Sequence, residues 1–378
     1  MSAFSDRCRP ASRLLLVGLV AGLGIVLTSA VSARAQMPAE AVEPGPRAQL
    51  APVTLAPNIE LPGREEFTPL DTEYTITEDI PAEIFAPYGQ AVFPCLASVP
   101  LNYYGFTVAD SWRGLPDGHY QNNNGAKKGV NLGLLIPGLE ELGIGVQLGG
   151  SFALYDTTGR ASVPYNTSGW QQQAFVTGGL FRRATPEVPV AAAIVYDGMI
   201  NKNYGEFAES PYLGQLRIQT GYAVSDVNEI GFWCALHMNS DTHQLFNSLP
   251  IEWRGINQYN LFWHHKYVET AADTWFWLGV PEHSRLNGQG SLGQLILGSS
   301  GSAPITDRLV LYGNAAYMMP SAHPSAAGST EDAFYVGFGV AVYPRRNARQ
   351  HNVRGNPTEP YLPVADNGSF FVDTSRSF

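Results

Sequence analysis

Polar side chains occupy alternate positions in three stretches of the chain that follow one another closely. They are Gln215, Arg217 and Gln219, then His237 and Asn239, and then Gln258, Asn260, His264 and Lys266. The basic side chains among them, with the amides in between, could form a weakly cationic constriction that favours anionic or polar solutes. The alternative is a hydrogen-bonded polar network that only fills space. The network is the favoured interpretation, because the lumen of a wide barrel needs polar residues in any case.

The turn between the first two stretches decides which of these side chains meet. A hairpin centred on Val227 would place Arg217 opposite His237, because the two residues are equally far from it in the sequence. The Cβ atoms of directly opposite residues in antiparallel strands lie about 5 Å apart. The sequence therefore predicts that these two side chains are neighbours.

Residues that could perform catalysis or bind a cofactor are few. The glycines of Gly143–Gly149 resemble a dinucleotide-binding fingerprint only in number, because their spacing is wrong and no helix follows. His264 and His265 would point to opposite faces of a strand, so they cannot bind one metal ion together. His265 shares its face with Leu261 and Trp263 and could serve an acyl hydrolase, but no strand offers a clear partner serine. The chain is predicted to be no enzyme and to need no cofactor or metal.

The stretch from Leu142 to Tyr155 indicates what kind of element carries the polar side chains. Its even-numbered residues, from Ile144 to Leu154, have no charged or hydrogen-bonding side chain. Its odd-numbered residues, which include Gln147, are small or weakly polar and carry no charge. A period of two indicates a β-strand, and the second face suits the lumen of a barrel. We interpret this lumen face as room for a pore or a plug.

Similar runs recur from residue 101 to residue 343, and the connections between them tend to alternate between short and long. The predicted runs are Leu101–Trp112, Gly129–Ile136, Leu142–Tyr155, Gln172–Arg183, Pro189–Gly198, Pro211–Ser225, Glu229–Asn239, Gly255–Tyr267, Thr274–Glu282, Ser291–Ser299, Arg308–Met319 and Ala333–Tyr343. The predicted fold class is all-β, an antiparallel up-and-down transmembrane β-barrel of twelve strands with both ends in the periplasm.

The other segments flank this barrel. Residues 1–35 have the positive start, apolar run and small-residue cleavage site of a secretory signal peptide. Residues 36–100 are predicted to be a Pro-rich periplasmic linker followed by an irregular segment. Residues 344–378 are predicted to form a basic periplasmic tail. The net charge of −10 argues against nucleic acid as a partner.

With the signal peptide, the alternating connections and the strand patterns, the chain resembles porin-like bacterial outer-membrane β-barrel proteins over roughly residues 101–343. Phe334–Tyr343 is similar to the closing strand of that family, with alternating apolar residues and a final aromatic residue. The resemblance implies an outer-membrane location in contact with lipid. It also implies a narrow channel for small polar or anionic solutes, or a structural envelope component. The alternative is a secreted soluble β-barrel that binds a ligand inside, which the apolar outward faces disfavour.

Large aromatic residues near the ends of the runs are predicted to form interfacial girdles, with ordinary sheet packing as the alternative. They are Tyr155, Tyr222, Trp253, Trp263, Tyr267, Trp275, Trp277 and Tyr343.

Overall fold

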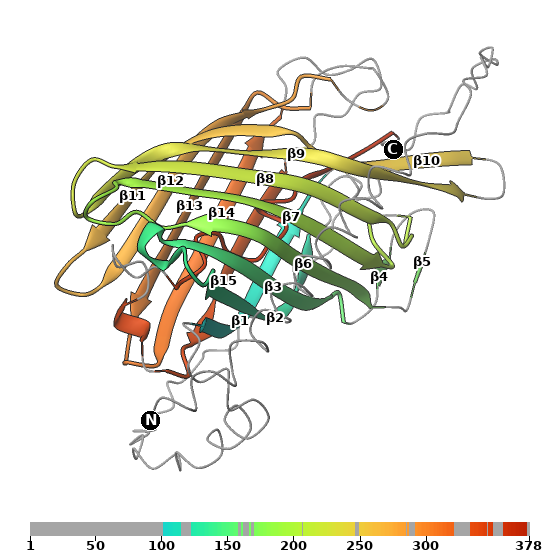
Figure 1. The fold of residues 1–378 in the computed structure, drawn as a ribbon. Helices are drawn as coiled ribbons and strands as arrows, with labels where there is room; N and C mark the ends of the chain where they lie inside the picture. The colour runs from blue at the N-terminus through green and yellow to red at the C-terminus, as the bar shows by residue number, and fades with distance from the viewer. Residues whose placement is uncertain are drawn as a thin grey trace, which may run out of the picture.

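The computed structural model describes residues 101–114, 122–157, 160–161, 166–167, 170–205, 207–245, 249–284, 286, 292–320, 333–345, 347–350 and 358–375. Within these residues twelve strands form a closed antiparallel barrel, as predicted (Figure 1). The strands are β1 (Leu101–Arg113), β2 (Asn123–Leu135), β3 (Ile144–Tyr155), β6 (Gln171–Arg182), β7 (Val190–Lys202), β8 (Tyr212–Ala223), β9 (Asn228–Leu245), β11 (Gln258–Tyr267), β12 (Ala272–Pro281), β13 (Leu295–Pro304), β14 (Leu309–Met319) and β15 (Ala333–Val342). The predicted signal peptide and linker lie outside the described residues.

Each barrel strand pairs with its neighbours in chain order, and β15 pairs with β1 to close the ring. Short connections at 136–143, 183–189, 224–227, 268–271 and 305–308 lie at one end, which we call the short-turn end. The opposite end is the long-loop end. β1 begins and β15 ends at the short-turn end. Among the described residues no helix is long and apolar enough to cross a membrane.

β9 is long because it extends beyond the barrel wall, where it pairs with β8 and β11, into a hairpin with β10 (Leu249–Gly255). Its first part, Asn228–Ala235, pairs with β11 in the barrel wall, and its last part pairs with β10. β16 (Val372–Thr374) pairs with the other side of β10. The connection between the predicted runs Glu229–Asn239 and Gly255–Tyr267 is expected to be one of the long loops. Most of it is instead this hairpin, in which Ile251 and Trp253 are fully buried. The remaining elements are the short strands β4 (Arg160–Ala161) and β5 (Asn166–Thr167) and the 3₁₀ helices η3 (Glu140–Leu142) and η4 (Ala348–Gln350).

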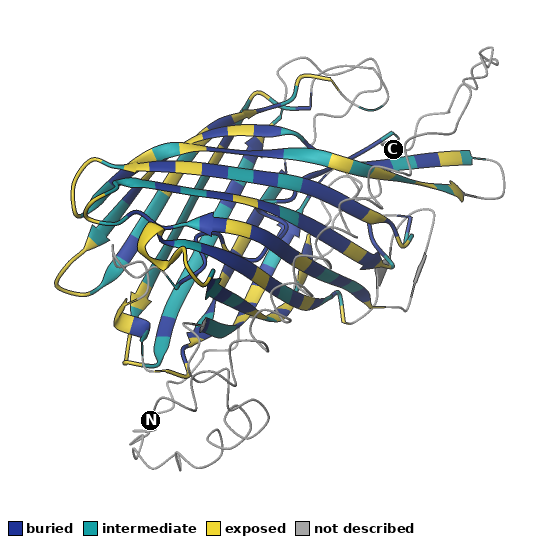
Figure 2. Ribbon diagram, viewed as in Figure 1, coloured by how far each residue is buried: buried dark blue, intermediate teal, exposed yellow. Residues whose placement is uncertain are grey.

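Side chains alternate between an exposed outer face and a buried inner face along the barrel strands (Figure 2). On β15, Val336 and Phe338 are 51% and 61% exposed, whereas Tyr335 is 1% exposed. On β3, Phe152 is 49% exposed and Ala153 is fully buried. Most barrel strands contribute such exposed apolar side chains, so the outer face is an apolar surface, as the alternation predicts.

The C-terminal part of the chain runs inside the barrel. Near the short-turn end, Glu359 lies 3.8 Å from Arg183, which follows β6. Beyond it the chain reaches the long-loop end, where β16 pairs with β10 (Figure 1). We call residues 358–371 the lumen segment.

The predicted periplasmic tail is therefore corrected for residues 358–374. The lumen segment is apolar enough to be buried, with Tyr361, Leu362 and Phe370 at most 5% exposed. The inner face also leaves room for it, because a Cβ atom on Gly133 would lie 2.2 Å from the Thr358 carbonyl oxygen. The small residues of the inner face thus accommodate a plug.

The aromatic girdle prediction is wrong for most of its residues. Tyr222, Trp263 and Tyr267 are on the outer face, where they are 52%, 44% and 46% exposed. The others are buried or belong to the inner face: Tyr155, Trp253, Tyr343, Trp275 and Trp277. Proximity to a strand end did not predict orientation, because orientation follows the parity of each position along its strand.

Candidate functional site

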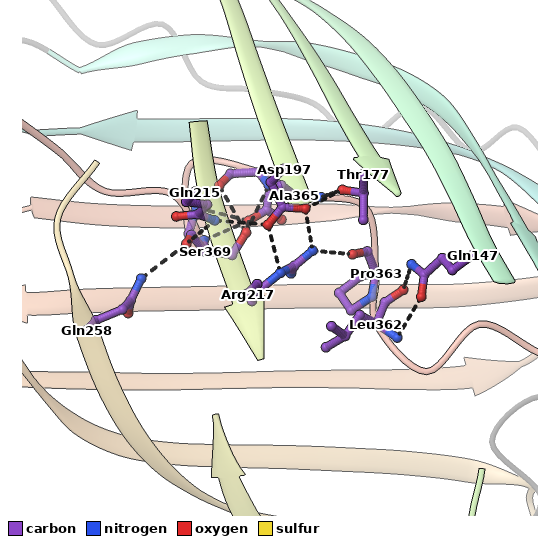
Figure 3. A network of polar contacts seen from close by, with 12 residues as sticks. Gln147, Thr177, Asp197, Gln215, Arg217, Gln258, Leu362, Pro363, Ala365 and Ser369 are labelled. Atoms are coloured by element: carbon purple, nitrogen blue, oxygen red, sulfur yellow. Dashed lines mark hydrogen bonds and ion pairs between the residues drawn. The ribbon is translucent and has the colours of Figure 1, made fainter. Parts of the chain in front are cut away.

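Amide side chains of the barrel wall hold the backbone of the lumen segment (Figure 3). Gln147 on β3 contacts Leu362 twice: its Nε2 donates to the carbonyl oxygen, and its Oε1 accepts from the N–H at 3.3 Å. Asn131 on β2 donates to the same carbonyl oxygen at 3.0 Å. Because this part of the segment pairs with no strand, its buried N–H and C=O groups need such partners.

Similar contacts continue toward the long-loop end. The Ala365 N–H donates to Thr177 Oγ1 at 2.9 Å. Gln215 on β8 and Gln258 on β11 both donate to the Ser369 carbonyl oxygen, at 3.2 and 3.1 Å. Together with Asn131 and Gln147, these contacts mean that β2, β3, β6, β8 and β11 all share in binding one short stretch of backbone.

The charge of Arg217 is compensated inside the barrel. Its Nε lies 2.9 Å from Oδ2 of Asp197 on β7, and its Nη2 donates to Asp197 Oδ1 at 3.1 Å. The same Nη2 donates to the Pro363 carbonyl oxygen at 2.8 Å. Arg217 and Asp197 are 3% and 0% exposed. This arrangement is a hydrogen-bonded network that includes the lumen segment, and it leaves Arg217 without a free positive charge for a constriction.

The sequence analysis missed Asn131, Thr177 and, at the centre of this network, Asp197. Asp197 also accepts hydrogen bonds from Thr177 Oγ1 at 2.6 Å and from Gln215 Nε2 at 3.1 Å. Its strand, β7, has apolar residues at both odd and even positions, so the sequence did not show which face points inward. The available signal was the single carboxylate in an otherwise uncharged strand core, since a buried charge needs a partner.

A second ionic cluster joins the lumen segment to the wall near β1 and β2. Lys127 Nζ lies 3.5 Å from Asp110 and 3.6 Å from Asp366 of the lumen segment, and it donates to the Tyr335 hydroxyl at 3.0 Å. Asp366 also accepts from Asn314 at 2.8 Å. The segment is thus bound on opposite sides of the lumen.

Two acidic groups surround His264 near the short-turn end. The His264 ring nitrogens lie 3.5 Å from Glu229 and 3.2 Å from Asp273, and the ring stacks on Trp275 at a centroid distance of 3.8 Å. Glu229 also accepts from the Tyr361 hydroxyl of the lumen segment. His264 therefore belongs to the packing network rather than to an open passage.

The other predicted lumen residues divide into three groups. Gln219 and Asn260 are buried, and Asn260 donates to Gln258 at 3.3 Å. His237 and Lys266 are half-buried, and the His237 ring lies 3.1 Å from Asn257 Oδ1. Asn239 lies on the outer side of the wall instead, so its prediction as a lumen residue is wrong.

A β-bulge on β9 changes the side on which Asn239 lies. Gln215 pairs with His237, but the preceding Gly214 pairs with Asn239, so Met238 is an extra residue. A bulge of this kind shifts the alternation. Asn239 consequently accepts from the hydroxyl of Tyr196, which lies 3.1 Å from the hydroxyl of the exposed Tyr212.

The predicted contact between Arg217 and His237 is also wrong. Arg217 pairs with Ala235, and Ala223 pairs with Glu229, so the hairpin is centred on Asp226. The register of a hairpin follows its turn geometry, which the sequence alone placed one residue too late.

A cavity remains beside the lumen segment. It has a volume of about 260 Å³ and lies between the segment and the wall formed by β9, β11–β15 and β1. Its wall contains Trp233, Phe262, Trp275, Trp277 and Tyr312. This part of the wall is largely aromatic, although Gln258 on β11 and Asn314 on β14 also contact the lumen segment.

His243 lies on the part of β9 beyond the barrel wall, between two carboxylates. Its ring nitrogens are 2.8 Å from Glu209 and 3.3 Å from Asp241. Burial favours the neutral ring, but the hydrogen bond to Glu209 and the charge of Asp241 outweigh it and raise the pKa of His243. A raised pKa contributes stability that is complete below the ordinary histidine pKa of about 6.5 and is lost as the pH rises through the folded-state value.

We therefore expect the β9–β10 hairpin to open more readily at pH 8 than at pH 6, by on the order of 1 kcal/mol or less because His243 is partly exposed. Hydrogen exchange of the hairpin amides, corrected for the intrinsic rate, measures this. In His243→Gln the difference should disappear. Equal protection of the native hairpin at both pH values would contradict the assignment.

His265 points to the outer face, as predicted, and its Nδ1 lies 2.9 Å from Asn228 Oδ1. The indole of Trp263 donates to the same oxygen at 3.1 Å. In the described part of the chain no serine hydroxyl is bonded to the His265 ring. The histidine is oriented by an amide and lacks the Ser–His contact of an acyl hydrolase there.

A family model with the description "Family of unknown function (DUF6666)" matches residues 103–372. The match extends past β15 to residue 372, so it includes the lumen segment. A search of curated proteins finds no match.

Among solved structures, the fold is similar to the COG4313 outer membrane channel from Pseudomonas putida F1, with 9% identity, a TM-score of 0.41, and 64% of this chain and 94% of that chain covered. It is also similar to the KdgM porin, with 6% identity, a TM-score of 0.35 and coverage of 63% and 98%. The outer membrane phospholipase of Salmonella typhi matches with 10% identity, a TM-score of 0.35 and coverage of 64% and 90%. Similarity at this level carries no argument about activity.

Proposed function

The chain belongs to DUF6666, a family of unknown function, and from its geometry we propose that it is an outer-membrane β-barrel whose lumen is closed in large part by its own C-terminal segment. It would reach the periplasm through a signal peptide in residues 1–35. The passage left for small solutes is then the space beside the lumen segment. The observation that carries this proposal is the binding of residues 358–371 by inner-face side chains of several strands.

The apolar outer face supports the membrane location. Leu261, Leu278 and Phe338 are 67%, 51% and 61% exposed, and similar side chains lie on most strands. Soluble monomers rarely expose continuous apolar patches larger than a few hundred Å². A barrel in a bilayer needs such a face, because lipid surrounds it.

We expect Phe338→Lys to lower the free energy of unfolding in lipid vesicles by about 2–4 kcal/mol, which is the cost of a lysine near the bilayer centre. The matched control is Val268→Lys in a short turn, where residue 268 is 79% exposed. The control should change stability by no more than about 0.5 kcal/mol. Urea titration of the folded protein in vesicles provides the measurement.

A soluble barrel would give a different result. In that case Phe338→Lys would be as mild as Val268→Lys, and the protein would be recovered in the soluble fraction without detergent. Either finding would overturn the membrane location.

For solute passage we propose a narrow route without strong charge selectivity. The support is the compensation of Arg217 by Asp197 at 2.9 Å and of Lys127 by Asp110 and Asp366 at 3.5 and 3.6 Å. In planar bilayers the full chain should show small conductance steps, and a chain that lacks the lumen segment should show large ones. If both chains are silent although folded, the role as a structural envelope component is favoured instead.

A further inference from the structure

The cavity beside the lumen segment has inward aromatic rings that none of the residues described by the structure covers completely. Four rings on the inner side of the wall line the cavity and are only half-buried: those of Trp275, Trp277, Tyr104 and Tyr312. Elsewhere inside the protein large rings are covered, as for Tyr155 and Phe175, which are 0% and 1% exposed. Unfilled aromatic surface in an interior is costly, since buried apolar area is a main source of stability.

The rings around the cavity offer both faces and edges. The centroids of Trp233 and Trp277 are 6.3 Å apart with planes at 74°, and those of Phe262 and Trp275 are 5.0 Å apart at 41°. Aromatic rings attract one another in tilted and edge-to-face arrangements at such distances. A further flat ring inserted among them would find favourable contacts on more than one side.

The charges at the border of the cavity already have partners. Arg217 is paired with Asp197 at 2.9 Å, and Lys127 with Asp110 at 3.5 Å. Asp273 accepts hydrogen bonds from Ser302 and from Trp275. An ionic ligand would have to lose its water without gaining a free counter-charge among these residues, which is unfavourable.

From these three observations we propose that the cavity is a binding site for a small neutral aromatic molecule of one or two rings. The volume of about 260 Å³ is slightly below the range of about 300–1,000 Å³ typical of pockets for drug-sized ligands, which limits the occupant to that size. Ser300 at the border can serve a single polar substituent. The proposal goes beyond passage of solutes and does not depend on it.

The test uses the full chain in lipid nanodiscs and 4-nitrobenzyl alcohol, a neutral ring that quenches tryptophan fluorescence. We expect saturable quenching. The anion 4-nitrobenzoate, with the same ring, should bind at least about tenfold more weakly because its charge must be desolvated. Empty nanodiscs with free tryptophan correct for partition into lipid.

Two variants locate the site. Ser300→Phe fills the cavity from β13 and should weaken binding at least about tenfold. The side chain of residue 299 points to the outer face of the same strand, so Ser299→Phe should bind like the native chain. Tyr312→Leu, which removes one ring, should bind more weakly and serves as the second variant if Ser300→Phe does not fold. Heat-modifiable migration on a gel reports folding of each variant.

Linear quenching without saturation, or equal binding by the Ser299→Phe and Ser300→Phe chains, would overturn the proposal. Saturable binding in a protein that shows no conductance would leave it standing and reject only the channel.

Discussion

A chain that ends at residue 350 should form a much more conductive pore than the full chain. The lumen segment fills part of the lumen, where Gln147, Thr177, Arg217 and Gln215 bind it from β3, β6 and β8. Without it the lumen of a twelve-stranded barrel would fill with water, because such a ring is wider than the eight-stranded barrels that side chains alone can fill. Single-channel recording in planar bilayers gives the readout.

The stability of the truncated chain should fall at the same time. Each buried hydrogen bond contributes about 0.5–1.5 kcal/mol net, and the wall amides lose several at once, although water replaces part of the loss. The matched control ends at residue 375 and keeps the whole described segment, so its conductance and stability should equal those of the full chain. Equal conductance of a folded chain that ends at residue 350 would refute closure by this segment.

The second large effect is expected at the ion pair between β7 and β8. Asp197→Ala leaves the guanidinium of Arg217, only 3% exposed, without its carboxylate. Removal of one partner from a buried pair costs about 3–5 kcal/mol. The free energy of unfolding in urea should fall by this amount, and the hydrogen bond from the same guanidinium to Pro363 at 2.8 Å should weaken because Asp197 no longer orients it.

The double variant Asp197→Leu with Arg217→Met separates charge from packing. A well-packed apolar pair often replaces a buried ion pair at no cost, so this variant should recover most of the lost stability. Because it removes both charges, the double variant should also leave the reversal potential in a salt gradient unchanged. A loss of anion preference in the double variant would instead support a cationic constriction.

The alternation of β3, β8 and β15 was enough to predict the barrel, because lipid-facing and lumen-facing positions differ in chemistry at every second residue. The same rule placed Gln147, Gln215 and Arg217 on the inner side. It failed at Asn239, where one extra residue in β9 shifts the parity. No local pattern marks such a bulge, so it could not be predicted from this stretch.

The lumen segment was missed for a different reason. Residues 358–371 have neither the period of a strand nor that of a helix, and their backbone is satisfied by side chains more than a hundred positions earlier, such as Gln147 and Asn131. Burial of this kind is a property of the finished barrel. The glycines at 133 and 149, whose Cβ atoms would collide with Thr358 and Val364, mark its path only once the path is known.

The passage of the C-terminus through the ring also constrains how the protein can be assembled. The seam between β15 and β1 closes at residues that precede the lumen segment in the chain, and the chain then emerges beside β10 at the opposite end. Residues 358–374 must therefore be enclosed while the seam is open, or be threaded through the finished ring as an extended strand. A folded domain fused to the C-terminus would be too wide to pass through the ring behind this segment. A folded reporter at that end should therefore block maturation, whereas one inserted in a long loop should not.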